Sequence, residues 1–175
     1  GVLESPGLMA FLPRLAKHLL GQELRLPSVA TWWCGQQREL DYVLANLPSL
    51  VLRSINRTAG SRPVFGDQLD NAALASWRER IRAQPHLYVG QERLPPSSAP
   101  TLHNGLLEPR QSILRTFLTA SQDSYVVMPG GLTRVGDKPE SRIVSNQAGA
   151  LSKDTWVLAS EPEQIDTLLP QTQVA

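Results

Sequence analysis

Helical periodicity is confined to the first half of the 175-residue chain, and strand-like runs separated by short turns fill most of the second half. Apolar residues recur at helical spacing in three segments: 8–19, 40–47 and 73–81. Short apolar runs typical of strands occupy 50–55, 87–92, 112–118, 125–128, 142–144 and 155–158. Helices followed by strands predict an α+β fold with flanking helices and a largely antiparallel sheet, which can divide into two small lobes.

Local signals mark where the helices begin and end. Ser5-Pro6 combines an N-cap with a proline at the first helical position, and Gly21 is suited to a C-terminal stop. Pro13 lies inside the first helical pattern, so we expect a kink or a new helix to begin there. Asp70 is expected to cap the third helix and Pro85 to end it.

The segments between these elements define the predicted domain organisation. The stretch 56–66 is rich in Gly, Arg, Ser and Pro, and 95–100 is punctuated by prolines, so both are predicted to be loops. We expect one partial domain over 1–160, with a helix-containing lobe at about 1–85 and a sheet lobe at about 86–160. The remaining residues, 161–175, are acidic and then polar, which predicts a flexible tail.

The composition limits the classes of function. A formal net charge of +1 gives no strong electrostatic case for binding nucleic acid or an anionic membrane. Arg78, Arg80 and Arg82 alternate around the third helix and are interpreted as solvated charge, with nucleic-acid contact as a weaker alternative. The single cysteine, Cys34, cannot form an internal disulfide, and no apolar run approaches the ~20 residues of a membrane span. A cytoplasmic setting is therefore expected, and a first residue other than methionine suggests a portion of a longer protein.

Five motifs carry a resemblance to a known family. They are Leu26–Gly35, Pro63–Gly66, Val89–Glu92, Met128–Val135 and Ser152–Leu158. In their order and spacing, over about residues 2–158, the chain resembles a carboxy-terminal piece of the circularly permuted ATP-grasp family, type 2, the relatives of glutathionylspermidine synthase.

The resemblance implies a chemistry. ATP would be gripped between two lobes, a small carboxylate would be activated as an acyl phosphate, and an amine or peptide would attack it to form an amide. Magnesium is implied as a cofactor, with its ligands expected upstream of Gly1, so no metal ligand is assigned within the chain. Neither nucleic acid nor a membrane is expected as a partner. Without the metal ligands, the chain alone is expected to form no amide bond and to hydrolyse ATP only at background.

The resemblance also nominates residues on the first strands. Arg53 is the first candidate for a phosphate contact, because phosphoryl transfer needs cations around the phosphates. Family members usually have lysine and proline where this chain has Arg53-Ser54, so a strand-end arginine in a surface ion pair is an equal alternative. The 56–66 loop would cover the phosphates. Gln91 and Glu92 are predicted to hold adenine and ribose at a hinge between the lobes.

Further candidates lie in the second half. Arg115 shares a predicted strand face with Ile113 and Phe117, so it is expected to point inward and to need a partner. That partner is either the nucleotide phosphates or a carboxylate, Glu92 or Glu108. The remaining candidates are Arg134, aimed inward by a tight turn at 130–131, Lys153, and the amides Asn146 and Gln147. Cys34 lacks an accompanying His motif and is predicted to be packed rather than nucleophilic.

Two functions of different classes remain open at this point. The first is the nucleotide-binding portion of an ATP-dependent carboxylate–amine ligase, with Arg115 and Arg134 as catalytic residues and Arg53, Gln91, Glu92 and Lys153 as nucleotide-binding residues. The second is a degenerate ATP-grasp module that acts as a binding or scaffold domain. The changed Arg53-Ser54 pair is the feature that keeps the second open.

Overall fold

The computed structural model describes residues 2–56, 62–121, 124–139, 144 and 149–158. The chain divides into two compact units, residues 1–94 and 95–175, and each is described by itself. Helices occur in the first unit, and the described part of the second unit is built from strands. The predicted fold class, an ATP-grasp-like α+β fold with mostly antiparallel strands, is confirmed.

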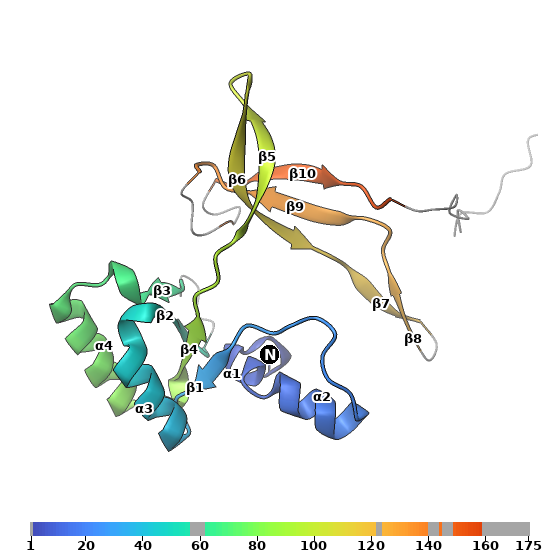
Figure 1. Ribbon diagram of the computed structural model, residues 1–175. Coiled ribbons are helices and arrows are strands. Elements are labelled where there is room, and N and C mark those ends of the chain that lie inside the picture. Colours follow the sequence, from blue (N-terminus) through green and yellow to red (C-terminus); the bar gives the residue numbers. More distant parts are fainter. Residues whose placement is uncertain (1, 57–61, 122–123, 140–143, 145–148, 159–175) are drawn as a thin grey trace, which may run out of the picture. The chain divides into compact units, whose positions relative to one another are not determined.

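The first unit is a four-stranded antiparallel sheet with helices on both sides (Figure 1). Its helices are α1 (Pro6–Met9), α2 (Leu12–Leu20), α3 (Gln37–Asn46) and α4 (Asn71–Ala83). Its strands are β1 (Thr31–Trp33), β2 (Leu50–Ser54), β3 (Val64–Phe65) and β4 (Tyr88–Glu92), in the order β1-β4-β2-β3. None of the described helices is long and apolar enough to cross a membrane.

The predicted helix ends are confirmed. The Ser5 hydroxyl accepts a hydrogen bond from the Gly7 amide at 3.2 Å, and Pro13 lies in the first turn of α2, a separate helix. Gly21 ends α2 in the left-handed region, with φ of 66°. The Asp70 carboxylate accepts a hydrogen bond from the Ala73 amide at 2.7 Å and caps α4. Each signal is local, which is why the sequence predicts it.

One face of the first unit's sheet packs on α3 and α4 and forms the core. The buried residues of this cluster are Cys34, Val43, Leu47, Leu50, Leu52, Leu74 and Ile81. Gly90 lies opposite Leu52, where a Cβ atom would come within 2.8 Å of the Val43 side chain. The absence of a side chain at Gly90 therefore lets α3 approach the middle of the sheet.

The second unit has a four-stranded antiparallel sheet and a separate hairpin. The sheet order is β10-β9-β6-β5, from β5 (Ser97–His103), β6 (Leu106–Arg115), β9 (Gly131–Val135) and β10 (Leu151–Thr155). The hairpin joins β7 (Leu118–Ser121) to β8 (Ser124–Val127). All described pairings are antiparallel.

Several predicted boundaries in this half are wrong. Residues 97–100 belong to β5 rather than to a loop, and the strand expected at 155–158 is β10, which ends at Thr155. The turn predicted at 130–131 ends one residue early, because Gly131 is the first residue of β9. Of the strand predicted at 142–144, residues 142–143 lie outside the described residues, and Val144 is in no strand. The predicted tail, 161–175, also lies outside them.

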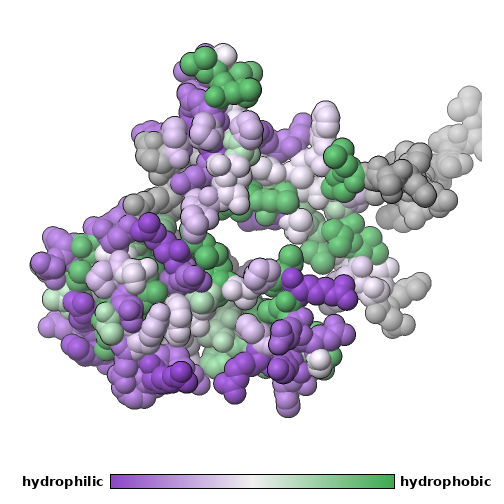
Figure 2. All heavy atoms as spheres, in the orientation of Figure 1, coloured by the Kyte–Doolittle hydropathy of each residue, from purple (hydrophilic) through white to green (hydrophobic). Residues whose placement is uncertain are grey.

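The second unit buries little apolar surface in its described part. Val135 is its one buried apolar residue there, whereas large apolar side chains are exposed on the β5–β6 hairpin and on β7–β8 (Figure 2). A cation is buried instead: Arg110 is only 4% exposed. Its guanidinium donates to the Glu108 carboxylate at 2.7 and 3.1 Å and to the Asp137 carbonyl. An arginine that fills its hydrogen bonds in this way tolerates burial.

Candidate functional site

The face of the first unit's sheet opposite the core carries polar side chains on its central strands. Strand register places Gln91 of β4 between Val51 of β2 and Thr31 of β1. Arg53 lies two residues beyond Val51, and paired residues in a sheet share a face. Arg53, Gln91 and Thr31 therefore lie together on this face, which α1 partly covers.

Hydrogen bonds join these three side chains. The Arg53 guanidinium donates to the Gln91 carbonyl oxygen at 3.2 Å, and the Gln91 amide nitrogen donates to the Thr31 hydroxyl at 3.0 Å. The same nitrogen lies 3.5 Å from the Met9 sulfur, so α1 also contacts the cluster. Because Gln91 is 6% exposed, its bonded amide has little freedom and holds the Arg53 side chain in place.

Glu92, predicted as Gln91's partner at the hinge, does not share this face. It is exposed at the end of β4, and successive side chains of a strand point to opposite faces. Its backbone amide donates to the Ala30 carbonyl at 2.8 Å and extends the pairing of β4 with the segment before β1. The structure thus brings Gln91 and Arg53 together and separates Glu92 from them.

Thr31 and Met9 are contacts of the cluster that the sequence did not single out. Thr31 lies within a motif that carried the family resemblance, but a three-residue strand gives little periodicity from which to predict its face. Met9 comes from the last turn of α1. Only the tertiary packing of α1 on the sheet reveals its contact with Gln91.

The expectation that Arg115 points inward is wrong. Arg115 is exposed as the last residue of β6. Ile113, and Phe117 just after the strand, were expected to share a buried face with it and are exposed too. The buried arginine of this strand is Arg110, and it takes the Glu108 carboxylate that was proposed for Arg115. The two arginines are five residues apart, so they lie on opposite faces of the strand.

Arg134 and Lys153 lie on neighbouring strands of the second unit but on different faces. Arg134 of β9 pairs with Ser152 of β10, so Lys153 belongs to the alternate set. The Lys153 ammonium donates to the Pro100 carbonyl. Arg134 is half-buried, and its Nε atom has no hydrogen-bond partner among the described residues. Asn146 and Gln147 lie outside the described residues.

The described residues provide no metal cage and no activated thiol. No group of three or more His, Cys, Asp or Glu side chains comes together among them. Cys34 is 1% exposed, and burial raises the pKa of its thiol to about 11. A thiol with that pKa stays protonated at neutral pH, so the prediction that Cys34 is packed rather than nucleophilic is confirmed.

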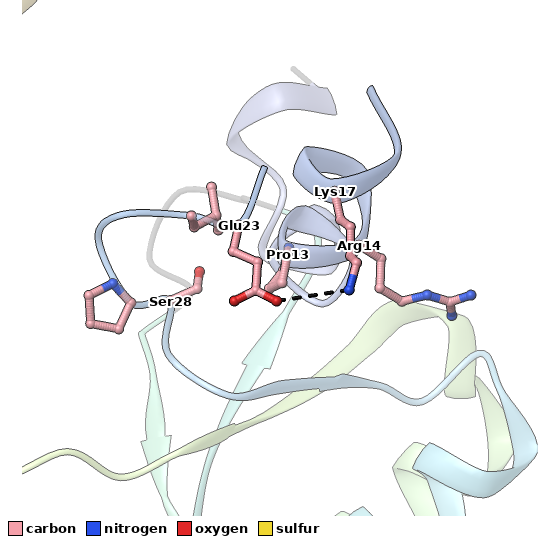
Figure 3. A pocket seen from close by; sticks show the side chains of 7 residues that line it. Pro13, Arg14, Lys17, Glu23 and Ser28 are labelled. Atoms are coloured by element: carbon pink, nitrogen blue, oxygen red, sulfur yellow. Dashed lines mark ion pairs between the residues drawn. The ribbon is translucent and has the colours of Figure 1, made fainter. Parts of the chain in front are cut away.

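A surface pocket of about 390 Å³ lies between α2 and the segment that follows it (Figure 3). Its lining includes Arg14, Lys17 and Glu23, and the Lys17 ammonium lies 3.9 Å from the Glu23 carboxylate. Both of these side chains are largely exposed, so the ion pair is screened by water. None of the predicted site residues lines this pocket.

The architecture, a few helices with mostly antiparallel sheets, is consistent with an ATP-grasp-like fold. Residues 1–136 match the family described as circularly permuted ATP-grasp type 2, and the chain belongs to this family.

The chain is also similar to longer proteins. It is 37% identical over 157 residues to a protein of Frankia alni named "Putative glutamate--cysteine ligase 2-3". The aligned region covers 90% of the chain and 18% of that protein. An uncharacterised protein of Synechocystis is 35% identical over 158 residues, 90% of the chain and 33% of its own length. An uncharacterised protein of Mycobacterium tuberculosis is 35% identical over 159 residues. The chain therefore spans a third or less of the first two relatives.

Proposed function

We propose that the chain is the nucleotide-binding portion of a cytoplasmic ATP-dependent carboxylate–amine ligase. The observation that carries the proposal is the cluster of Arg53, Gln91 and Thr31, in which a buried amide holds a guanidinium on the face of the sheet opposite the core. Family membership supports it, and so does the ligase named among the relatives.

The proposed reaction forms an amide in two steps. An oxygen of the substrate carboxylate bonds to the γ-phosphorus of ATP as the bond to the β,γ-bridging oxygen breaks, which yields an acyl phosphate and ADP. The amine then attacks the acyl carbon, phosphate leaves, and the amine loses a proton. Both steps concentrate negative charge on phosphate oxygens, and a fixed cation stabilises that charge without reorganising.

Arg53 is the proposed phosphate contact of the first unit. A guanidinium has several N–H donors in a planar fork, so a bond to Gln91 is compatible with donation to phosphate oxygens. The proposed nucleotide therefore lies along the face that carries Arg53, with Gln91 toward its base. The Glu92 side chain points to the opposite face, so its proposed contact with the ribose requires the nucleotide to reach past the end of β4. Magnesium would neutralise phosphate charge when bound, and no group of three or more candidate ligands for it comes together among the described residues.

Titration of the chain with ATP tests the proposal. We expect backbone amide shifts in NMR spectra at Arg53, Gln91 and Glu92, with a dissociation constant in the millimolar range, which corresponds to about 4 kcal/mol. No shift at millimolar ATP, or shifts confined to α4, would contradict nucleotide binding at this face. Hydrolysis by the chain alone should not exceed background, and a clear metal-dependent ATPase signal would overturn that expectation. Arg115, Arg134 and Lys153 stay proposals, each tested by its own alanine variant in the same titration.

The Arg53-Ser54 pair, in place of lysine and proline, favours the second candidate function, a degenerate module that serves as a binding or scaffold domain. Arg53→Ala distinguishes the two. If Arg53 holds phosphate, this variant should weaken ATP binding by about 1.5 to 3 kcal/mol, the range for a hydrogen bond to a charged group, and Arg53→Lys should retain or improve binding.

The exposed Arg82 of α4 provides the matched control, since Arg82→Ala removes the same charge far from the cluster. If the Arg53 variants and Arg82→Ala all bind ATP like the wild type, the result favours the second candidate function, a degenerate binding or scaffold module. If Arg53→Ala unfolds the domain, Arg53 is a structural partner of Gln91, and its assignment to phosphate must be withdrawn.

A further inference from the structure

A small apolar cavity lies beside α1 in the first unit. It has a volume of about 250 Å³ and is lined by Ser5, Gly7, Leu8, Phe11, Trp33 and Ile55. One wall is α1 with its flanking residues, and the other is Trp33 of β1 and Ile55, which follows β2. The apolar side chains of the lining are only partly buried, so the cavity presents wet apolar surface that a ligand could cover.

The walls of this cavity are fixed by contacts within the unit. The Trp33 indole N–H donates to the His86 carbonyl at 3.0 Å, and the Phe11 ring packs edge-on against the Trp33 ring with centroids 5.9 Å apart. A Cβ atom on Gly35 would lie 2.2 Å from the Trp33 ring, so glycine at this position leaves room for the indole. The cavity is therefore held open before any ligand arrives.

Strand register locates the cavity relative to the proposed nucleotide site. Gln91 is near one end of β4, Val89 pairs with both Arg53 and Trp33, and the Leu87 carbonyl accepts from the Ile55 amide at 2.9 Å. At roughly 3.3 Å per residue, Tyr88, where β4 begins next to Leu87, lies about 10 Å along the strand from Gln91. Along this face the Gln91 amide comes first, the Arg53 guanidinium next and the apolar cavity last.

We propose that the cavity binds the apolar part of the carboxylate substrate, with the carboxylate directed toward Arg53. This inference rests on the proposed function. There the base of ATP lies near Gln91 and its phosphates near Arg53, so the substrate carboxylate must reach the γ-phosphate from the side of Arg53 that faces away from the base. Apart from Ser5, whose hydroxyl accepts a hydrogen bond from the Gly7 amide, the side chains that line the cavity are aromatic or aliphatic, and none of them carries a charge. Its volume suits one aromatic ring or one branched alkyl group. The substrate class is therefore a small monocarboxylate that carries an aryl or branched alkyl group.

Phenylacetate, added without ATP, is the probe. We expect it to shift the Trp33 indole N–H signal, assigned with Trp33→Phe, while acetate at the same concentration has no effect. Gly7 offers a way to fill the cavity, because a Cβ atom there would lie 3.4 Å from Ile55 and 3.8 Å from Trp33. Gly7→Leu should weaken phenylacetate binding at least tenfold, and the smaller Gly7→Ala should weaken it several-fold. Ala72→Leu adds nearly as much bulk to the exposed side of α4 and should change nothing.

Several outcomes would overturn the inference. These are the absence of a Trp33 shift at millimolar phenylacetate, unchanged affinity in a folded Gly7→Leu, and competitive displacement of phenylacetate by adenosine, which would make the cavity a nucleobase pocket. If Gly7→Leu does not fold, Gly7→Ala decides. Arg53→Ala should weaken phenylacetate but not benzyl alcohol, and equal effects on both would remove the proposed orientation. If the chain binds phenylacetate but not ATP, the proposed ligase function is wrong, whereas the proposed carboxylate-binding site is supported.

Discussion

Gln91 and Arg53 show how a buried polar side chain can position a half-buried one. The Gln91 amide both accepts from Arg53 and donates to Thr31, so its orientation is determined by two partners of opposite polarity. Leaving such a buried group unpaired costs about 1–3 kcal/mol, which favours the bonded arrangement. Motif resemblance could nominate Gln91 and Arg53 separately. Their mutual hydrogen bond depends on the register of β2 with β4, which single residues do not reveal.

Cys34 makes the first unit sensitive to alkaline pH. Burial raises the pKa of its thiol from 9.0 to about 11, and the hydrogen bond with the Gly90 backbone offsets part of this rise. The unfolded chain therefore loses its thiol proton at lower pH than the folded chain does. The contribution of Cys34 to stability is complete below pH 9 and is lost as the pH rises from about 9 to 11.

Denaturant unfolding of the wild type and of Cys34→Ala at pH 8, 9, 10 and 11 measures this effect. The alanine variant should be less stable at pH 8, because it leaves a small cavity in the core, and the difference should shrink toward pH 11. A constant difference across this range would mean that the thiol does not titrate differently in the two states.

Helix ends and hairpins differ in how well they can be predicted from residues that are adjacent in the sequence. The caps at Ser5 and Asp70 were predictable because each uses residues adjacent in sequence. The β5–β6 hairpin also had a local signal, since Asn104 and Gly105 adopt φ of 50° and 80°, as a type I′ turn requires. The prediction did not use this signal and took the proline-punctuated stretch 95–100 for a loop. Pro100 is tolerated because β5 is at the edge of the sheet.

Arg115 and Arg110 show where strand periodicity stops being informative. Alternation identifies which residues share a face, but it gives the buried face only when one face is clearly apolar. On β6 both faces mix apolar and charged residues, and Ile113 and Leu114 are both exposed. The sequence therefore could not decide which arginine is buried.

Gly66 is the glycine on which the packing of the segment after β3 depends. A Cβ atom there would lie 1.9 Å from the Leu47 carbonyl oxygen, a backbone atom that cannot rotate away. Gly66→Ala should therefore lower the free energy of unfolding by about 3 kcal/mol, near the upper end for overpacking. Gly7→Ala is the matched control, because its new methyl would meet neighbours at 3.4 Å or more. Thermal unfolding compares the two, and equal Tm values would show that the Leu47 turn moves freely.

Burial is distributed unevenly over the whole chain. Of the buried apolar residues in the described part, all but Val135 belong to residues 1–94. The two-stranded β7–β8 hairpin has only exposed residues in its described part, and an isolated hairpin is marginally stable in water. Hydrophobic burial is the main favourable term in folding, so the two units should differ in stability.

Hydrogen exchange followed residue by residue tests this difference. Strands β2 and β4 contain the fully buried residues Leu52 and Val89. We expect the amides of these two strands to exchange at least a hundredfold more slowly than those of β7 and β8. A hundredfold difference corresponds to about 2.7 kcal/mol in opening free energy, little more than the burial of one large apolar side chain. Residues 1–94 expressed alone should keep the slow exchange of β2 and β4, because their core partners all lie within that segment. Uniform protection across both units, or loss of protection in the isolated segment, would mean that the first unit's core does not determine its stability.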